Sequence, residues 1–158
     1  MKNPAIMTDT RISKLTLHLV PDRPGIAADI FGRLGEADLN VSILTVSGGA
    51  VGRSDISFTV GREDVERTAA LLETMRTELG AASISRRDDV AAISLIAEQM
   101  HRTPGVAGRM FRTLSAAGIN IDMISATSAA VTCVIDARFL DAAIESLRQE
   151  FQIELARR

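Results

Sequence analysis

The chain has 158 residues, of which 46% are hydrophobic, and its formal net charge of −2 comes from interspersed acidic and basic side chains. This size suits one medium domain or two small ones. The absence of a basic stripe, of Trp and of Tyr argues against a nucleic-acid partner. The sequence shows no signal-peptide core and no apolar run near the roughly 20 residues of a membrane helix, so we expect a cytoplasmic protein with no membrane partner.

The first half of the chain alternates between strand and helix patterns. Residues 1–13 are polar and mixed, which is typical of a flexible start, although residues 5–7 could form a short strand. Leu15, Leu17 and Leu19 alternate with polar residues and predict a strand with one buried face. Apolar residues at helical spacing then predict two helices. The expected elements are a strand at 15–20, a helix at 24–38 with Pro24 in its first turn, strands at 39–46 and 56–60 joined by a glycine-rich hairpin turn at 47–52, a helix at 64–79 and a strand at 81–86.

The second half of the chain repeats the first. At an offset of 80 (104 − 24) the identical pairs are Pro24/Pro104, Gly25/Gly105, Ala27/Ala107, Phe31/Phe111, Leu34/Leu114, Ala37/Ala117 and Asn40/Asn120. A self-match this dense predicts two copies of one supersecondary unit. After a charged linker at 86–89, the expected elements are a strand at 91–97, a helix at 104–117 with Thr103 as its N-cap, strands at 119–126 and 130–135, a helix at 139–150 and a last strand at 151–155.

The order of elements predicts the fold class. Each half reads βαββαβ, the split-βαβ or ferredoxin-like unit, in which an antiparallel four-stranded sheet carries both helices on one face. We therefore expect an α+β protein with two such units, at 14–87 and 90–156. The sheet face without helices and the sheet edges need cover, so two such units tend to associate. This fold hosts many activities and does not by itself give a function.

No constellation for catalysis or metal binding is visible in the sequence. The two histidines, His18 and His101, lie in different halves, and neither belongs to a recognisable nucleophile–base pair or metal-ligand cluster. We interpret His18 as a solvated or edge-strand residue. The glycines at 47–52 join two strands and do not open a helix, as a phosphate-binding loop would. The lone Cys133 lies in an apolar run, so a buried strand position is expected. We expect no cofactor.

The repeated Pro-Gly before a helix is the one local pattern with a chemical logic. The start of a helix offers free N–H groups and the positive end of the helix dipole, which suit a carboxylate. Gly25 and Gly105 carry no Cβ, so a ligand can approach closely. Asp22, just upstream, could hold an ammonium group. Together these groups could bind a free amino acid, whereas the alternative interpretation is a plain tight turn.

These motifs resemble the ACT domain, an amino-acid-sensing module, and the pair resembles the regulatory region of aspartate kinase. The stretches that carry the resemblance are Pro21-Asp22-Arg23-Pro24-Gly25-Ile26-Ala27, Asp55-Ile56-Ser57-Phe58-Thr59-Val60, Pro104-Gly105-Val106 and Gly118-Ile119-Asn120-Ile121-Asp122-Met123-Ile124-Ser125. The resemblance implies a regulatory subunit or fragment that lacks the catalytic kinase domain. It implies a homodimer through the ACT units, assembly with a catalytic kinase subunit, and a further strand from residues 4–10 in the second unit.

The resemblance also implies an amino-acid effector of the lysine or threonine class, bound between ACT units. The corresponding residues are Asp22, Gly25, Ile26, Ala27, Asn40, Val41 and Ser42 in the first unit and Gly105, Val106, Asn120, Ile121, Thr127 and Ser128 in the second. The chain has Ser42, Val46 and Ala130 where the family often carries Asp, Gln and a basic residue. Losing one hydrogen bond to a charged group weakens binding about tenfold or more. Two alternatives therefore stay open: the small regulatory subunit of acetolactate synthase, which the chain resembles only in its first half, and a structural ACT assembly module with degenerate pockets.

Overall fold

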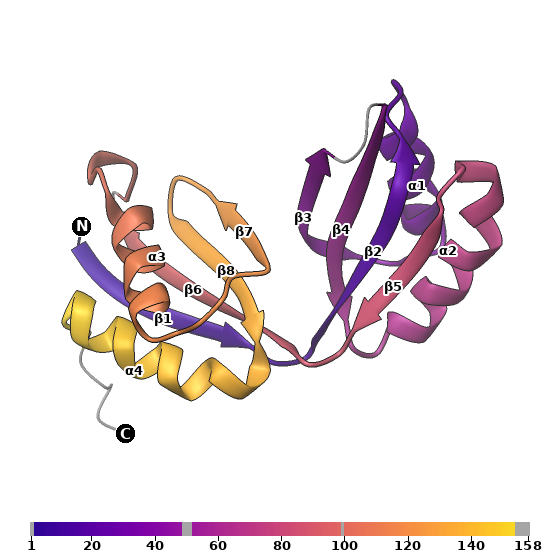
Figure 1. Ribbon diagram of the computed structural model, residues 1–158. Coiled ribbons are helices and arrows are strands. Elements are labelled where there is room, and N and C mark those ends of the chain that lie inside the picture. The colour runs from indigo at the N-terminus through magenta and orange to yellow at the C-terminus, as the bar shows by residue number, and fades with distance from the viewer. Residues whose placement is uncertain (1, 49–51, 99, 154–158) are drawn as a thin grey trace. The chain divides into compact units, whose positions relative to one another are not determined.

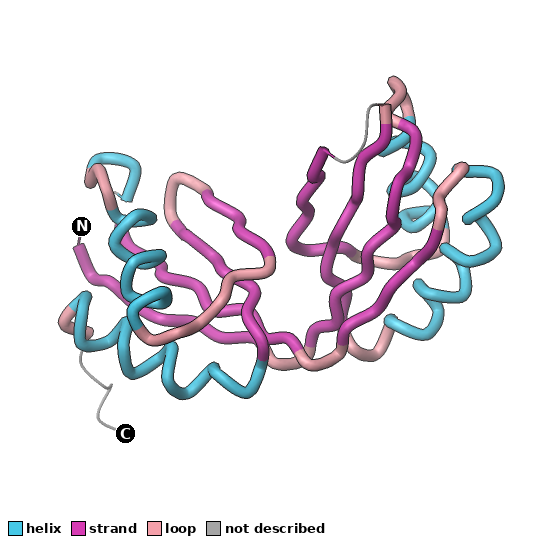
Figure 2. Tube along the Cα trace, viewed as in Figure 1, coloured by secondary structure: helices cyan, strands magenta, loops and turns pink. Residues whose placement is uncertain are grey.

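The computed structural model describes residues 2–48, 52–98 and 100–153, and the chain divides into two compact units (Figure 1). The first unit is Arg11–Asp88. The second unit combines Met1–Thr10 with Asp89–Arg158, so it is formed by two segments that flank the first unit in the sequence. Each unit is a four-stranded antiparallel sheet with two helices against one face, as Figure 2 shows by its colours. The predicted α+β class with two ferredoxin-like units is confirmed.

The first unit follows the predicted order of elements. They are β2 (Ile12–Pro21), α1 (Ile26–Glu36), β3 (Val41–Gly48), β4 (Arg53–Gly61), α2 (Val65–Leu79) and β5 (Ser83–Arg87). The strand order in the sheet is β3-β4-β2-β5, which places β2 in the interior and β3 and β5 at the edges. His18 was interpreted as a solvated or edge-strand residue. Its side chain is partly solvated, at 34% exposure, but β2 is not an edge strand because it has a neighbour on each side.

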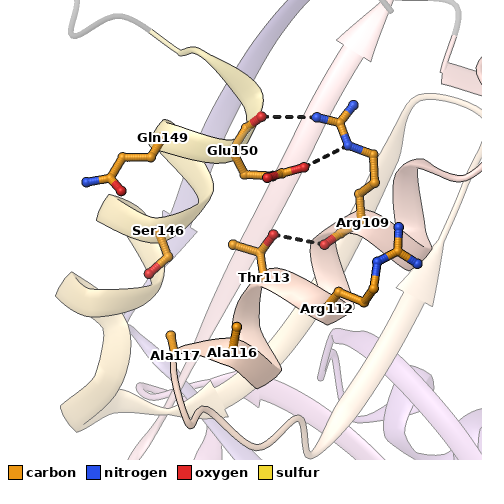
Figure 3. A pocket seen from close by; sticks show the side chains of 8 residues that line it. All are labelled: Arg109, Arg112, Thr113, Ala116, Ala117, Ser146, Gln149 and Glu150. Carbon is orange, nitrogen blue, oxygen red and sulfur yellow. Dashed lines mark hydrogen bonds and ion pairs between the residues drawn. The ribbon is translucent and has the colours of Figure 1, made fainter.

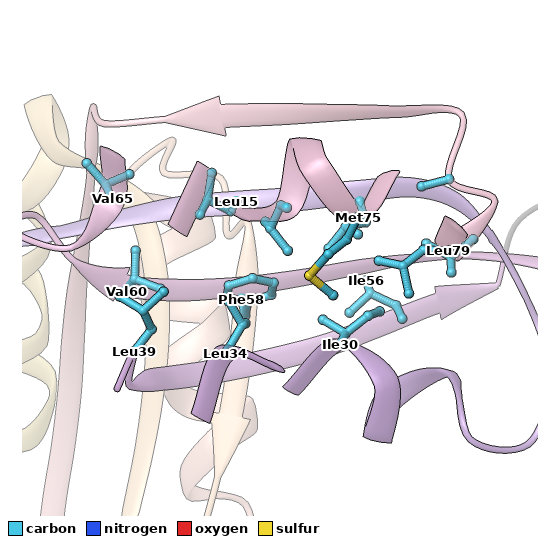
Figure 4. Close-up of a cluster of buried hydrophobic side chains, with 14 residues drawn as sticks. Leu15, Ile30, Leu34, Leu39, Ile56, Phe58, Val60, Val65, Met75 and Leu79 are labelled. Carbon is cyan, nitrogen blue, oxygen red and sulfur yellow. The ribbon is translucent and has the colours of Figure 1, made fainter. Parts of the chain in front are cut away.

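The core of the first unit lies between its sheet and its two helices. Leu15 pairs with Phe58 across β2 and β4, and both side chains are fully buried. They pack with Ile30 of α1 and Met75 of α2, which Figure 4 shows among the other buried side chains. Each such side chain contributes about 1.5–3 kcal/mol when buried. The predicted alternation is confirmed for Leu15 and Leu17, which are buried, but it is wrong for Leu19, which is 40% exposed. A shift in the pairing of β2 with β4 after Leu17 and a positive φ of 53° at Leu19 turn that side chain away from the core.

The second unit differs in how its sheet is completed. Its elements are β6 (Val90–Glu98), α3 (Val106–Ala116), β7 (Met123–Ala126), β8 (Ala130–Asp136) and α4 (Leu140–Phe151), with short 3-10 turns η1 (Met100–Arg102) and η2 (Ala137–Phe139). The fourth strand is β1 (Lys2–Asp9), and the strand order is β1-β6-β8-β7. β1 runs antiparallel to β6, with Ala5 opposite Ile96. The start of the chain is a strand and not a flexible tail.

The end of the second unit corrects a prediction. The last strand was expected at 151–155, but Phe151 ends α4 and Gln152 follows in a left-handed conformation with φ of 54°. Ile153 belongs to no strand, and residues 154 and 155 lie outside the described residues. The physical reason is that β1 already occupies the position beside β6 that β5 has in the first unit. The strand predicted at 119–126 is also shorter than expected, because β7 begins only at Met123.

The helix-free faces of the two sheets carry different side chains. In the first unit the strand register puts Lys14, Thr16 and His18 on this face, with Ser57 opposite Thr16. In the second unit the equivalent face is mainly apolar, and the register places these residues on it: Val90, Ala92, Ile96, Met123 and Val134. One feature is common to both faces, a hydrogen bond between two hydroxyls of neighbouring strands. It joins Thr16 to Ser57 (2.8 Å) in the first unit and Ser94 to Thr132 (2.7 Å) in the second.

Candidate functional site

Both units begin their first helix in the same way. The N-cap is a glycine in the left-handed region, Gly25 with φ of 93° before α1 and Gly105 with φ of 85° before α3. This conformation favours glycine because a Cβ would crowd the adjacent carbonyl. Two predicted details are wrong as a result. Pro24 precedes the helix and does not lie in its first turn, and the N-cap of α3 is Gly105 and not Thr103.

Neither helix start is capped by a side chain. The first N–H groups of a helix have no acceptor within the helix, and the helix dipole makes this end positive. The two starts differ in charge. Asp29 lies in the first turn of α1, whereas the first turn of α3 has no acidic residue. Both starts leave N–H groups available to an anion, and at α1 the nearby Asp29 carboxylate is bonded to Arg23.

The loop before α1 is tied down on both sides. The N–H of Asp22 donates a hydrogen bond of 2.9 Å to the carbonyl of Gly52, which anchors the loop to the turn before β4. The Arg23 guanidinium donates a hydrogen bond of 2.6 Å to the Asp29 carboxylate and so balances the acid in the first turn. Asp22 itself is exposed. Its carboxylate is accessible at the helix start, as the ammonium-binding hypothesis requires.

The other expected site residues of the first unit lie at the far end of α1. The helix has 11 residues, which at about 1.5 Å per residue separates its ends by roughly 16 Å. Gly25, Ile26 and Ala27 mark the start, whereas Asn40 and Val41 follow the C-terminal end, with Ser42 next in β3. Asn40 is exposed and Val41 is half-buried. A single unit therefore holds two separate groups of expected ligand-binding residues and does not bring them together.

The second unit repeats this separation. α3 also has 11 residues, with Gly105 and Val106 at its start and Asn120 beyond its end. Val106 is buried and packs in the core, so its contribution to a site is limited to the backbone. Asn120 is exposed and Ile121 is half-buried, and both lie in the segment before β7. A small ligand that contacts both groups needs residues from two units or from two copies of the chain.

Comparison with known proteins identifies the family. Models of the ACT domain match residues 15–77 and 93–151. A chain in a crystal structure of aspartokinase alpha and beta subunits is 34% identical to this one, and the match covers 94% of this chain and 97% of that one with a TM-score of 0.88. The chain belongs to the ACT-domain family of aspartate kinase regulatory regions. The ligand-free regulatory subunit of aspartate kinase from Thermus thermophilus agrees, with 28% identity, coverage of 92% and 96% respectively, and a TM-score of 0.87.

The ACT pair corresponds to one part of the full-length enzymes. Aspartate kinase Ask_LysC of Stutzerimonas stutzeri is 32% identical over 142 residues, which is 90% of this chain and 34% of that protein. The aspartokinase of Mycolicibacterium smegmatis gives 33% identity over 145 residues, again with 34% of the longer protein covered. The chain thus spans about a third of the length of these relatives. It comprises the ACT regulatory region and not the catalytic domain.

In the second ACT unit, Thr127 stabilises the turn between β7 and β8. Its hydroxyl accepts hydrogen bonds from the N–H groups of Ala130 (3.0 Å) and Ala129 (3.3 Å). Its own N–H donates to the Ala130 carbonyl at 2.8 Å. Ser128 is exposed at the tip of the same turn. Thr127 therefore closes the hairpin, and Ser128 is the more accessible of the two hydroxyls for a ligand.

A groove of about 590 Å³ lies between α3 and α4 on the outer, helical side of the second ACT unit (Figure 3). None of the expected effector residues lines it; its lining is Arg109, Arg112, Thr113, Ala116, Ala117, Ser146, Gln149 and Glu150. Arg109 is held at one end by the Glu150 carboxylate (2.8 Å) and the Glu150 carbonyl (3.0 Å), and it stacks over the Phe151 ring. These contacts join the two helices. The groove is thus a shallow seam between them, separate from the helix starts.

The first ACT unit contains one polar network that sequence reasoning missed. His18 of β2 lies between Asp55 of β4 and Ser85 of β5, with Nδ1 3.0 Å from Asp55 Oδ2 and Nε2 2.7 Å from Ser85 Oγ. The alternation of β2 does place His18 on the polar face. The register of β4 and β5, which brings in partners 37 and 67 residues away, leaves no local signature in the sequence.

Other expectations about reactive groups concern Cys133 and metals. Cys133 is fully buried in β8, which confirms the predicted strand position, and desolvation raises the pKa of its thiol to about 12. Such a thiol stays protonated and unreactive at neutral pH. Among the described residues, no group of three or more His, Cys, Asp or Glu side chains is arranged to hold a metal ion. Within the same ranges, no helix is long and apolar enough to cross a membrane.

Proposed function

We propose that the chain is an amino-acid-sensing regulatory subunit or fragment of aspartate kinase, which binds a feedback effector of the lysine or threonine class. The observation that carries the proposal is the pair of uncapped helix starts at Gly25 and Gly105. Each start offers N–H groups to an α-carboxylate, and Asp22 offers a carboxylate to an α-ammonium group. No side chain of the helix starts competes for those N–H groups through a cap.

The site is completed at an interface between ACT units. The helix-start group and the strand group around Asn40 or Asn120 lie at opposite ends of an 11-residue helix. A free amino acid is shorter than that separation of roughly 16 Å. The effector therefore joins the helix start of one unit to the Asn strand of another, and its binding favours the arrangement of units that closes the site.

Association of two copies is supported by apolar side chains at the sheet edges. Leu44 and Val46 of edge strand β3 are 44% and 61% exposed, and Ile124 of edge strand β7 is 42% exposed. Exposed apolar residues on an edge strand invite pairing with another strand. We propose a homodimer through these edges and a catalytic kinase subunit as the further partner. Val46→Glu should convert the dimer to monomer in analytical ultracentrifugation, whereas Glu36→Ala should leave it intact.

The effector test is a thermal-shift screen with lysine, threonine, methionine, isoleucine and valine, followed by calorimetry. A ligand at 100 times its Kd stabilises the protein by about 2.7 kcal/mol. We expect a response to lysine or threonine. Asp22→Ala should abolish it, whereas Glu36→Ala, which removes the same charge at the far end of α1, should not. An unchanged affinity of the Asp22 variant would refute the ammonium contact.

The same screen separates the two alternatives. A response to valine alone would favour the small regulatory subunit of acetolactate synthase, an alternative that rested on the first half of the chain only. The matches to aspartate kinases extend over about 90% of the chain, which favours the interpretation as an aspartate kinase regulatory region. If none of the five amino acids shifts the melting temperature and the dimer is retained, the result would favour the structural assembly module. That alternative rests on Val46 and Ala130, which replace polar residues of the family.

A further inference from the structure

The helix-free face of the first ACT unit brings a serine, a histidine and an aspartate into one chain of hydrogen bonds. Asp55, His18 and Ser85 come from β4, β2 and β5, which are neighbours in that order in the sheet. The distances are 3.0 Å from Asp55 Oδ2 to His18 Nδ1 and 2.7 Å from His18 Nε2 to Ser85 Oγ. The same order of groups activates serine nucleophiles on several unrelated folds, where it is recognised by geometry and not by sequence position.

The hydrogen bonds fix the direction of proton transfer along this chain. The second oxygen of Asp55 accepts the N–H of Leu19 at 2.8 Å, so the carboxylate is held from two sides. The Leu19 amide and the His18 imidazole together keep the pKa of the Asp55 carboxyl below its usual value. An ionised Asp55 can only accept, so Nδ1 of His18 carries a proton, and in the neutral imidazole Nε2 then has a free lone pair. Ser85 then donates its hydroxyl proton to Nε2.

The network is accessible from solvent in this chain. The side chains of His18 and Asp55 are 34% and 33% exposed, and Ser85 is exposed. Each sheet also has a pair of hydrogen-bonded hydroxyls without a histidine, Thr16 with Ser57 in this unit and Ser94 with Thr132 in the other. These pairs have no base to accept a proton. The imidazole distinguishes Ser85 from the other hydroxyls of the two sheet faces.

We propose that Ser85 is a nucleophilic acylation site, activated by His18 and positioned by Asp55, that accepts acyl groups from activated carboxylic esters or thioesters. Ser85 Oγ attacks the carbonyl carbon of the donor while its proton passes to His18 Nε2. The bond from that carbon to the leaving oxygen or sulfur then breaks, and the leaving group departs with the electron pair and takes up the proton. The product is an O-acyl ester on Ser85. This site is separate from the proposed effector site at the helix starts.

The test uses p-nitrophenyl acetate on the full chain at pH 7.5. This ester has a good leaving group, so its reaction needs little oxyanion stabilisation from the protein. We expect release of about one p-nitrophenolate per chain and a single acetyl group on the peptide that contains Ser85. Hydroxylamine should remove that group, because it cleaves esters but leaves acetyl-lysine amides intact. Acetylation of Lys14 or the N-terminal amine in place of Ser85 would overturn the proposal.

Three substitutions within the network separate activation of Ser85 from simple exposure of its hydroxyl, and a fourth variant is the control. Ser85→Ala removes the acceptor and should abolish the ester-linked label. His18→Gln removes the base, and general-base catalysis contributes about 10²–10⁴-fold, so labelling should fall at least a hundredfold. Asp55→Asn can still accept from the Leu19 N–H, but its amide donates to Nδ1 and selects the wrong tautomer, so labelling should fall by a similar factor.

The matched control is Ser57→Ala, which removes a hydroxyl from the same sheet face without touching the network. It should leave the label on Ser85 and its rate unchanged. Equal labelling rates in the parent, His18→Gln and Asp55→Asn proteins would show that Ser85 is merely exposed, and that result would also overturn the proposal. Because none of the four residues belongs to the helix starts, the amino-acid response in the thermal-shift screen should survive in all four variants.

Discussion

The two ACT units have equivalent cores, one in each unit, and they differ on the surfaces that lie outside those cores. Leu34 and Leu114 occupy equivalent buried positions in α1 and α3, at 1% and 0% exposure. The helix-free faces have diverged instead, one carrying the His18 network and the other mainly apolar side chains. The fourth strand also has a different origin, β5 in one unit and β1 in the other. Packing against helices constrains one face of each sheet, and the opposite face is free to acquire different chemistry.

The largest expected effect tests the origin of the fourth strand. Deleting residues 1–9 removes β1, its ladder with β6 and the packing of Ile6 on the core of the second unit. At about 1 kcal/mol per ladder hydrogen bond, the second unit should lose on the order of 5 kcal/mol while the first keeps its stability. Urea denaturation followed by hydrogen exchange of each unit measures this. Met7→Ser, which changes an exposed β1 side chain but keeps the ladder, is the control and should have little effect.

The next effect tests whether the two cores are equivalent. Leu34→Ala and Leu114→Ala each leave a cavity at the matching position, and each should cost about 2–5 kcal/mol. Each loss should be confined to its own unit, because the two side chains belong to separate hydrophobic clusters. Unit-resolved hydrogen exchange under urea is the measurement. A loss of protection in both units from a single substitution would contradict the division into two cores.

A smaller effect tests the two helix starts. Gly25→Ala and Gly105→Ala force a Cβ into the left-handed region and should each destabilise by about 1–2 kcal/mol. Gly32 lies inside α1 with open space around its missing Cβ and no positive φ. Gly32→Ala should therefore stabilise by about 0.5–1 kcal/mol. Chemical denaturation measures all three, and a destabilising Gly32→Ala would show that the backbone argument is incomplete.

The smallest effect tests the network of Asp55, His18 and Ser85 in the first unit. The folded-state pKa of Asp55 is below its unfolded value, so its ionised form stabilises the fold above the ordinary Asp range near 4. This contribution should fade as the pH falls through the folded pKa. The difference in urea midpoint between the parent and Asp55→Asn should thus be present at pH 7 and shrink at acidic pH. A difference independent of pH would exclude Asp55 as the titrating group.

Periodic patterns in the sequence were sufficient for the core and the repeat. The alternation of Leu15 and Leu17 predicted the buried face of β2, and the helical spacing of Ile30 and Leu34 predicted the buried face of α1. These signals are local, because burial of one face imposes a period on neighbouring residues. The completion of the second sheet was not predictable in this way. Ala5 pairs with Ile96, and pairing over such a distance has no local signature.

The candidate site was predictable in its parts but not in its assembly. The Pro-Gly pairs indicated special backbone at Gly25 and Gly105, and both have positive φ. The exact start of each helix was misplaced, because a glycine N-cap carries no side-chain signal such as Ser or Asp. The network of His18 and Ser85 was missed for a different reason. It depends on the register of three strands, which is set by the fold as a whole.

The pairing of β1 with β6 makes the first unit an insertion within the second. During synthesis β1 emerges before the first unit, but its partner β6 follows only after all of that unit, Arg11–Asp88, has been made. At about 5–20 residues per second, β1 waits on the order of 4–16 seconds on the ribosome. The first unit can fold in that interval, whereas β1 stays without a partner strand and open to wrong pairings. Hydrogen exchange on ribosome-bound chains, stalled after Asp88 has emerged and before β6 has, should show the first unit protected and β1 unprotected.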